Sequence, residues 1–226
     1  MMDSILTIVI KLLLLAPPIL MALTVHEAAH AWVASRRGDP TARLAGRVSL
    51  NPIRHLDPMG TLVFFLTAWL GSGFGWAKPV PVDWRRLQDP RRDIIWISAS
   101  GPAVNLLCAA LLAGALNLLI AAGAFAGAGL LMQYLGQLLV FGVQVNTVLA
   151  FFNLLPLPPL DGSGILTGLL PPRAAASYQG FTRYGFAILL ALIFLPDVIG
   201  GFPDVIGLVV LTPARAFMAW LMPALM

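Results

Sequence analysis

The stretch Val25-His26-Glu27-Ala28-Ala29-His30 ends an apolar run, Ile5 to Val25, whose only charge is Lys11. Histidines four residues apart lie on one face of a helix, where both imidazoles can bind a single Zn²⁺ ion. The glutamate between them can act as a base toward a water molecule at the metal. Ionisable groups at membrane depth are costly and are functional by default. The pattern therefore predicts a metal hydrolase that works within a lipid bilayer.

Composition also indicates a membrane protein. Of the 226 residues, 59% are hydrophobic and 11% are charged, and the mean hydropathy is +0.87. A soluble domain carries about 25% charged residues, so this chain cannot cover a globular surface with polar groups. The formal net charge of +4 is better explained by topology and lipid headgroups than by nucleic acid. The single cysteine, Cys108, excludes an intramolecular disulfide and a cysteine-based zinc site.

The apolar segments predict an all-α polytopic membrane protein with five or six transmembrane helices. Pro17 and Pro18 predict a kink in the first helix. Pro213 predicts a break in the last one, which would leave residues 214–226 as a helix in or on the membrane. At about 20 residues per span, we expect spans at 4–34, 93–122, 130–155 and 181–195, and from 204 onward.

Between the first two spans, the apolar stretch 59–76 is flanked by basic residues on both sides. By the positive-inside rule both flanks should be cytoplasmic, so we expect this stretch to enter the membrane and return. A true short span is the alternative. In the re-entrant topology the N-terminus is outside, and the motif at 26–30 and the segment 153–162 lie near the cytoplasmic side. The flanking residues are Arg36, Arg37, Arg43, Arg47 and Arg54 before the stretch, and Lys78, Arg85, Arg86, Arg91 and Arg92 after it.

A zinc site with two histidines needs a third protein ligand, and Asp161 is the leading candidate. It belongs to the segment Asn153-Leu154-Leu155-Pro156-Leu157-Pro158-Pro159-Leu160-Asp161-Gly162, whose prolines force irregular backbone at the end of a span. The alternative is an ordinary span exit with a solvated aspartate. His55, the only histidine outside the motif, is a conceivable replacement ligand. Otherwise His55 and Asp57 belong to a turn or pair near the site.

Together these motifs resemble the site-2 protease family of intramembrane zinc metalloproteases. The resemblance rests on His26-Glu27-x-x-His30, on Asn153-x-x-Pro156-x-Pro158-x-Leu160-Asp161-Gly162, and on Gly101-Pro102-Ala103-Val104-Asn105 between them. It covers a minimal core at 5–165, without PDZ or CBS domains. Residues 178–226 are expected to form accessory C-terminal spans of the same single domain, 1–226.

The resemblance implies a role for each motif residue. His26, His30 and Asp161 would bind one Zn²⁺ ion per chain, and Glu27 would activate the water. Asn105 would be a polar group close to the site. The implied reaction is hydrolysis of peptide bonds within or near the transmembrane segments of other proteins.

The resemblance also implies where a substrate lies. Phe74-Gly75-Trp76-Ala77-Lys78-Pro79-Val80 looks like the family's membrane-associated β element, whose edge pairs with an unwound substrate. Gly75, Trp76 and Ala77 are therefore expected substrate contacts, and Asn153 would help to hold the substrate backbone. The expected partners are single-span membrane proteins and the lipid bilayer, without nucleic acid. The expected location is the bacterial inner membrane, with the active site toward the cytoplasm.

Two other functions compete with this interpretation. A protease with a glutamate ligand is nearly excluded, because Glu27 is the only glutamate and the other nine acidic residues are aspartates. A zinc-binding scaffold or a metal transporter without protease activity is the alternative outside enzymes. A transporter predicts further ligands along a path through the membrane, and no such ladder of His or Asp is present in the sequence.

Overall fold

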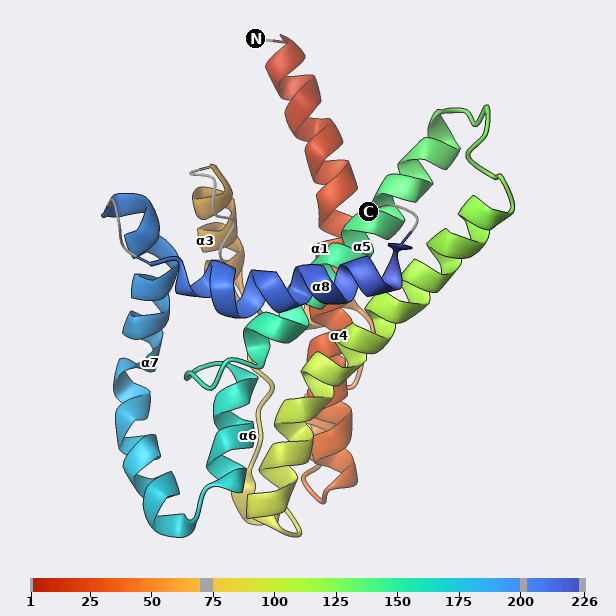
Figure 1. Cartoon of the computed structure of the whole chain (residues 1–226). Coiled ribbons are helices and arrows are strands. Elements are labelled where there is room, and N and C mark those ends of the chain that lie inside the picture. The colour runs from red at the N-terminus through yellow and green to blue at the C-terminus, as the bar shows by residue number, and fades with distance from the viewer. Residues whose placement is uncertain (1, 70–74, 200–202, 224–226) are drawn as a thin grey trace.

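The structure, a computed structural model, is built almost entirely of helices (Figure 1). It describes residues 2–69, 75–199 and 203–223, and no β-strand occurs within those ranges. The helices are α1 (Met2–Arg36), α2 (Thr41–Leu44), α3 (Pro58–Trp69), α4 (Pro90–Ala121), α5 (Leu130–Asn153), α6 (Asp161–Leu169), α7 (Pro172–Val198) and α8 (Thr212–Leu221), with 3₁₀ turns at Pro52–Arg54 and Trp84–Arg86.

Three of the described helices are long and apolar enough to cross a membrane: Pro90–Ala121, Leu130–Asn153 and Pro172–Pro196. They coincide with the second, third and fourth predicted spans. The 35 residues of α1 cover the first predicted span and stay helical through both internal prolines. A helix satisfies its own backbone hydrogen bonds, which lipid cannot do. The fold is therefore that of a polytopic helical membrane protein, and the total number of spans stays a prediction.

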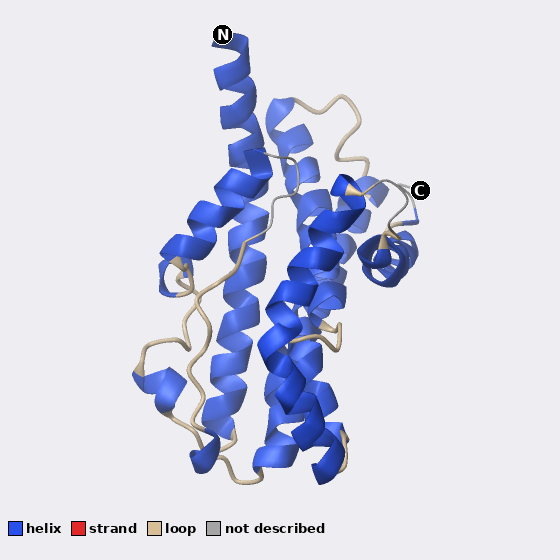
Figure 2. Cartoon of the chain, turned by 90° about the vertical axis from the view of Figure 1, so that its left-hand side faces the viewer, coloured by secondary structure: helices blue, strands red, loops and turns tan. Residues whose placement is uncertain are grey.

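Figure 2 shows helices connected by loops. Helix α4 is the central element, because it packs against α1, α5 and α6. Glycines on α6 bring the two backbones close together. A Cβ atom on Gly164 would lie 2.2 Å from Ser98 Oγ, and one on Gly168 would lie 2.4 Å from Ile95 Cγ1. This packing holds Asp161, the first residue of α6, against the middle of the bundle.

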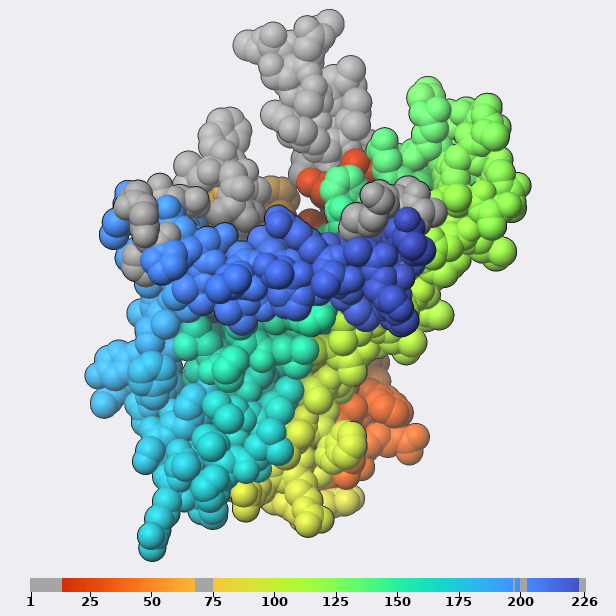
Figure 3. All heavy atoms as spheres, in the orientation of Figure 1, coloured from red at the N-terminus to blue at the C-terminus, as the bar shows by residue number. Residues whose placement is uncertain are grey.

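The last apolar helix lies across the bundle rather than along it (Figures 1 and 3). A π-helical turn, Gly207–Leu211, runs directly into α8, so the predicted break at Pro213 is wrong. Pro213 is the second residue of α8 and directly follows the π-helical turn, and the chain stays helical through it. The segment Gly207–Leu221 is also shorter than the roughly 20 residues that a span needs.

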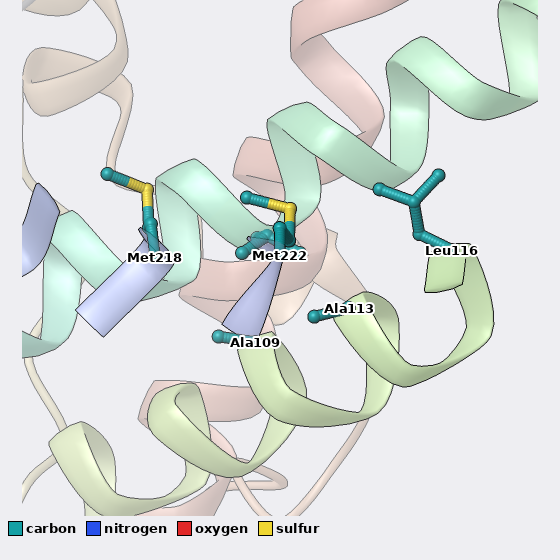
Figure 4. Packing of buried hydrophobic residues seen from close by; sticks show 6 residues of the cluster. Ala109, Ala113, Leu116, Met218 and Met222 are labelled. Carbon is teal, nitrogen blue, oxygen red and sulfur yellow. The ribbon is translucent and has the colours of Figure 1, made fainter. Parts of the chain in front are cut away.

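Methionines attach α8 to the bundle (Figure 4). Met218 and Met222 lie in one buried cluster with Ala109 and Ala113 of α4. The small alanines leave room for the flexible methionine side chains. Asn117 Nδ2 of α4 also donates a hydrogen bond of 2.8 Å to the carbonyl oxygen at the end of α8. The C-terminal helix thus covers α4 and α5 without entering the centre of the bundle.

The stretch 59–76 forms α3 and a returning extended segment, with residues 70–74 outside the described part. Leu56 and Ala77 form an antiparallel bridge, so the chain leaves and returns at neighbouring points, as a re-entrant element requires. Whether this stretch enters a bilayer and returns, or crosses it as a short span, stays a prediction. The expected β element is one bridge rather than a strand in the described residues. Pro79 and Pro81 explain this, because proline cannot donate to a strand ladder.

Candidate metal centre

Three side chains from α1 and α6 meet in the interior. His26 and His30 lie one turn apart on α1 and are 4% and 7% exposed. Asp161 Oδ2 lies 3.0 Å from His26 Nε2 and 3.2 Å from His30 Nε2. One ligand atom from each residue falls within 4.8 Å of the others. The sequence therefore predicted which three residues come together.

The approach of Asp161 depends on the proline-rich segment before α6. That segment ends α5 and folds back, so that α6 begins at Asp161. The turn requires glycine at position 162, because a Cβ atom there would lie 2.3 Å from the carbonyl oxygens of Leu154 and Leu155. The prediction of irregular backbone at the end of the span is confirmed for residues 154–160, but Asp161 itself lies in the first turn of α6.

Hydrogen bonds behind His26 fix which of its nitrogens carries the proton. The Asn105 amide donates to Ala22 O at 3.1 Å and to Asn146 Oδ1 at 2.7 Å, so Asn105 Oδ1 faces His26. Asn146 is oriented in turn, because its amide donates to Gly142 O at 2.8 Å. Asn105 Oδ1 lies 2.6 Å from His26 Nδ1 and can only accept. Nδ1 therefore holds the proton, and Nε2 of the neutral imidazole presents a lone pair.

A backbone carbonyl does the same for His30. Ile97 O lies 2.7 Å from His30 Nδ1 and can only accept, so Nδ1 is protonated. The Ser100 hydroxyl donates to the same carbonyl at 2.7 Å and lies 3.3 Å from Nδ1. His30 Nε2 then also presents a lone pair toward the centre of the cluster.

In neutral imidazoles with these tautomers, the lone pairs of both Nε2 atoms face Asp161 Oδ2. Asp161 Oδ2 is buried and, among the described residues, accepts no hydrogen bond. A buried carboxylate oxygen beside two unprotonated imidazole nitrogens is unfavourable unless a cation lies between them. Two imidazoles and one carboxylate form a ligand set that Zn²⁺ takes in catalytic sites. The three residues therefore fit a zinc ion.

Gly101 of α4 lies directly against this cluster. A Cβ atom on Gly101 would lie 2.5 Å from His30 Nε2 and 2.6 Å from His26 Nε2. The ligand nitrogens thus occupy the space that any other residue would need. Glycine at this position lets α4 serve as the wall of the site.

Replacement of Gly101 by alanine should displace the two imidazoles. We expect Gly101→Ala to weaken zinc binding by about 10- to 100-fold, the range seen when groups around metal ligands are altered. A competition titration with a zinc chelator measures the affinity. Gly114→Ala is the matched control, because it lies on the same helix and a Cβ there meets nothing within 4 Å. Equal affinities in the two variants would contradict the close approach.

Glu27 lies beside the cluster and contacts a buried arginine. Arg47, 4% exposed, places Nη2 3.8 Å from Glu27 Oε2. Its guanidinium donates to Pro79 O at 2.9 Å and also to Lys78 O. One side chain therefore connects the glutamate of the motif with the extended segment.

Asp39 fixes the same extended segment from the other end. Its carboxylate is fully buried and accepts hydrogen bonds from the backbone and hydroxyl of Thr41 and from the Asp83 N–H at 2.7 Å. Burial alone would raise the pKa of Asp39. The hydrogen bonds from Thr41 and Asp83 outweigh burial and lower it. The carboxylate thus stays charged and ties the turn after α1 to the end of the segment.

The expected substrate contacts Asn153, Gly75, Trp76 and Ala77 have partners of their own within the fold. The Asn153 amide donates to Leu149 O at 2.9 Å within α5. Gly75 packs on α3, and the Trp76 ring lies edge-on to Phe186 of α7 with centroids 6.2 Å apart. Ala77 forms the bridge described above. Phe74 falls outside the described residues.

His55 is not brought to the cluster. It is 1% exposed, and its Nε2 lies 2.8 Å from Ser49 O. Asp57 instead accepts a hydrogen bond from the Gly60 N–H at 2.8 Å. Both residues stabilise the loop before α3, as the turn interpretation of this segment expected.

Comparison with known proteins agrees with this geometry. A profile of peptidase family M50 matches residues 120–195. "Putative zinc metalloprotease YwhC" of Bacillus subtilis (strain 168) is 41% identical over 181 residues, which cover 79% of this chain and 78% of that protein. The chain belongs to the site-2 protease family, peptidase family M50. It is a zinc metalloprotease of that family.

Mycobacterial relatives share the same region. "Putative zinc metalloprotease Rip2" of Mycolicibacterium smegmatis (strain ATCC 700084 / mc(2)155) is 32% identical over 78% of this chain and 65% of that protein. The protein of the same name from Mycobacterium tuberculosis (strain ATCC 25618 / H37Rv) is 32% identical over 83% of this chain and 69% of that protein. No solved structure matches the chain significantly.

Some residues of this M50 site were not predicted in their roles. Gly101 was noted only as part of a motif, and Asn146 was given no role at the metal centre. Arg47 was counted among the basic flanks, although its guanidinium is buried beside Glu27. No sequence pattern marks the Ile97 carbonyl, because every residue carries one.

Proposed function

We propose that this chain is an intramembrane endopeptidase that hydrolyses peptide bonds within or near the transmembrane segments of other membrane proteins. The observation that carries the proposal is the meeting of the ligand atoms of His26, His30 and Asp161 beside Glu27. A second observation is its place in the fold. The cluster joins α1 and α6 inside a bundle of apolar helices rather than on a soluble domain.

Each side chain has one task in this proposal. His26, His30 and Asp161 hold one zinc ion, and Asn105 and Ile97 O keep the imidazoles in the tautomer that can bind it. Zinc, when bound, supplies Lewis-acid polarisation of the scissile carbonyl and makes water a nucleophile near neutral pH. Glu27 takes a proton from the attacking water and then delivers it to the leaving amine. Water and peptide thus become a carboxylic acid and an amine.

The substrate is a single-span membrane protein whose helix unwinds next to the extended segment 75–83. A helix must open before its peptide groups are accessible, and an extended edge offers hydrogen-bonding partners to the opened strand. Arg47 anchors this segment through the carbonyls of Lys78 and Pro79 and also contacts Glu27. Asn153 and Trp76 contact the substrate on either side. The product leaves toward the cytoplasmic face of a bacterial inner membrane.

The described residues favour a protease over a transporter. Among the described residues, one group of three potential metal ligands occurs, and it consists of His26, His30 and Asp161. A transport path needs successive sites, and polar residues within spans normally mark such paths. A silent zinc scaffold has no use for Glu27, which lies outside that ligand group.

Metal removal tests the proposal on purified protein in detergent. The chain should cleave members of a panel of single-span substrates, lose this activity with a zinc chelator, and regain it when Zn²⁺ is added back. Mass spectrometry of the products should locate the cut within or next to the substrate span. Activity that survives complete zinc removal would contradict the proposal, as would cuts confined to soluble loops far from the span.

A further inference from the structure

A cavity of about 520 Å³ opens between the C-terminal end of α1 and the N-terminal end of α4. These two ends lie at the same end of the bundle (Figure 1). Two arginines and two tryptophans line it: Arg36, Arg37, Trp32 and Trp96. The tryptophans are 52% and 57% exposed, although they lie on helices that pack against each other. Tryptophan is typical of the membrane interface, where the ring meets lipid headgroups.

Each arginine stacks on one of these rings. The Arg36 guanidinium lies 5.3 Å from the Trp32 ring centroid, and that of Arg37 lies 5.2 Å from the Trp96 centroid. Stacking orients a guanidinium but leaves its N–H donors available. Among the described residues the Arg36 side chain makes no hydrogen bond or ion pair, and the Arg37 side chain reaches one carboxylate, that of Asp93, at 3.5 Å. At the mouth of the cavity, the two guanidinium groups of Arg36 and Arg37 are therefore balanced by one carboxylate, that of Asp93.

Away from this mouth the lining is mostly small and apolar, and its one hydroxyl, that of Ser100, donates to Ile97 O. Val33 lies one turn deeper along α1, and Ala99 and Ala103 continue the wall along α4. The two alanines are one turn apart, so their small side chains leave a shallow channel between the helices. A soluble anion would use the arginines but would gain nothing from this inner wall.

We infer that this cavity binds one anionic phospholipid, with the phosphate between Arg36 and Arg37 and an acyl chain along Ala99 and Ala103. Guanidinium groups form paired, charge-assisted hydrogen bonds with phosphate. Basic pockets between membrane helices are suited to anionic headgroups, which gather at the cytoplasmic leaflet. The gradient from arginine through tryptophan to alanine matches the polarity of a phospholipid from headgroup to tail. None of the three proposed zinc ligands lines the cavity, although the Ser100 hydroxyl in its wall lies 3.3 Å from His30 Nδ1. The inference does not depend on the proposed protease activity.

Fluorescence quenching tests the inference, because Trp32 and Trp96 are two of the chain's six tryptophans. The full-length protein in detergent micelles is titrated with phosphatidylglycerol carrying brominated acyl chains, and in parallel with the phosphatidylcholine analogue. We expect saturable quenching by the anionic lipid and only weak, non-saturating quenching by the zwitterionic one. Native mass spectrometry should show one retained phosphatidylglycerol per chain. Equal quenching by both lipids would overturn the inference.

Matched variants separate a binding site from general surface attraction. Arg36→Gln should weaken binding about fivefold, since one basic group near an anionic lipid contributes about a tenfold effect or less. Arg92→Gln is the control, because this 82% exposed side chain pairs with Asp89 outside the cavity. Ala103→Leu should abolish saturable quenching by filling the channel without a change in charge. Equal loss in Arg92→Gln, full binding in Ala103→Leu, or displacement by inorganic phosphate would each contradict a lipid site.

Discussion

Glu27→Gln should abolish cleavage of a single-span substrate while the protein keeps its zinc. Glu27 is not one of the three residues whose ligand atoms meet, so the metal should remain bound. The amide cannot accept a proton from water, and general base catalysis contributes on the order of 10²- to 10⁴-fold. We expect a fall of about 10³-fold in the cleavage rate. Quantitative gel assays give the rate, and elemental analysis gives the zinc content.

A control must separate this chemistry from the loss of any acidic group. Asp204→Asn removes a carboxylate at the turn before α8, where Asp204 Oδ1 accepts a hydrogen bond from the Gly207 N–H at 2.6 Å. Asparagine can accept the same bond, so this variant should cleave at the wild-type rate. Cleavage by Glu27→Gln at that rate would assign the base to another residue. Zinc loss in Glu27→Gln would make the glutamate part of the metal site instead.

Arg47 connects Glu27, the proposed base, with the extended segment that we propose binds the substrate. Its guanidinium contacts Glu27 and also holds the carbonyls of Lys78 and Pro79. A movement of the extended segment therefore acts on the position of the glutamate. A buried arginine is costly unless its donors find partners. This arrangement provides them for the two terminal nitrogens.

The meeting of His26, His30 and Asp161 could be predicted from the sequence because it depends on few variables. Helical spacing places the two histidines on one face, and the order of spans brings the segment at 153–162 to the same side. Glycine and proline then mark where the backbone must turn. None of these inferences requires knowing how one helix is rotated about its axis relative to its neighbour.

The hydrogen bonds to the Nδ1 atoms of the two histidines cannot be predicted without the orientation of α4 relative to α1. Asn105 reaches His26 only because α4 packs on α1 with Gly101 against the imidazoles. A shift of one residue would turn Asn105 by about 100° away from the site. Helix packing in membranes is set by close contacts among small side chains, which leave a weak signal in a single sequence.

The C-terminal region shows a second limit of sequence reasoning. Residues from 204 onward are apolar enough to be read as a span, and Pro213 as its break. Hydropathy reports whether a segment avoids water, but it does not report the direction of the helix. The methionines that hold α8 across α4 and α5 contact alanines more than a hundred residues away in the chain. Such a contact follows from the fold and not from local pattern.

Asp161→Ala should release zinc and abolish cleavage together. The variant removes one of three ligands and leaves two imidazoles, so zinc affinity should fall by more than the roughly 10- to 100-fold of a change behind a ligand. Asp89→Ala is the matched control, because Asp89 also lies at the N-terminal end of a helix but caps α4 away from the cluster. It should keep its zinc. Chelator competition and elemental analysis provide both values.

Full zinc content in Asp161→Ala would place the third ligand elsewhere, and His55 would be the next residue to test. The structure argues against this outcome, because His55 Nε2 lies 2.8 Å from Ser49 O and its ring is buried in another loop. Addition of His55→Ala to Asp161→Ala would separate the two cases. Loss of zinc in Asp161→Ala alone would explain why the buried Asp161 Oδ2 accepts no hydrogen bond, because this oxygen would then be the zinc ligand.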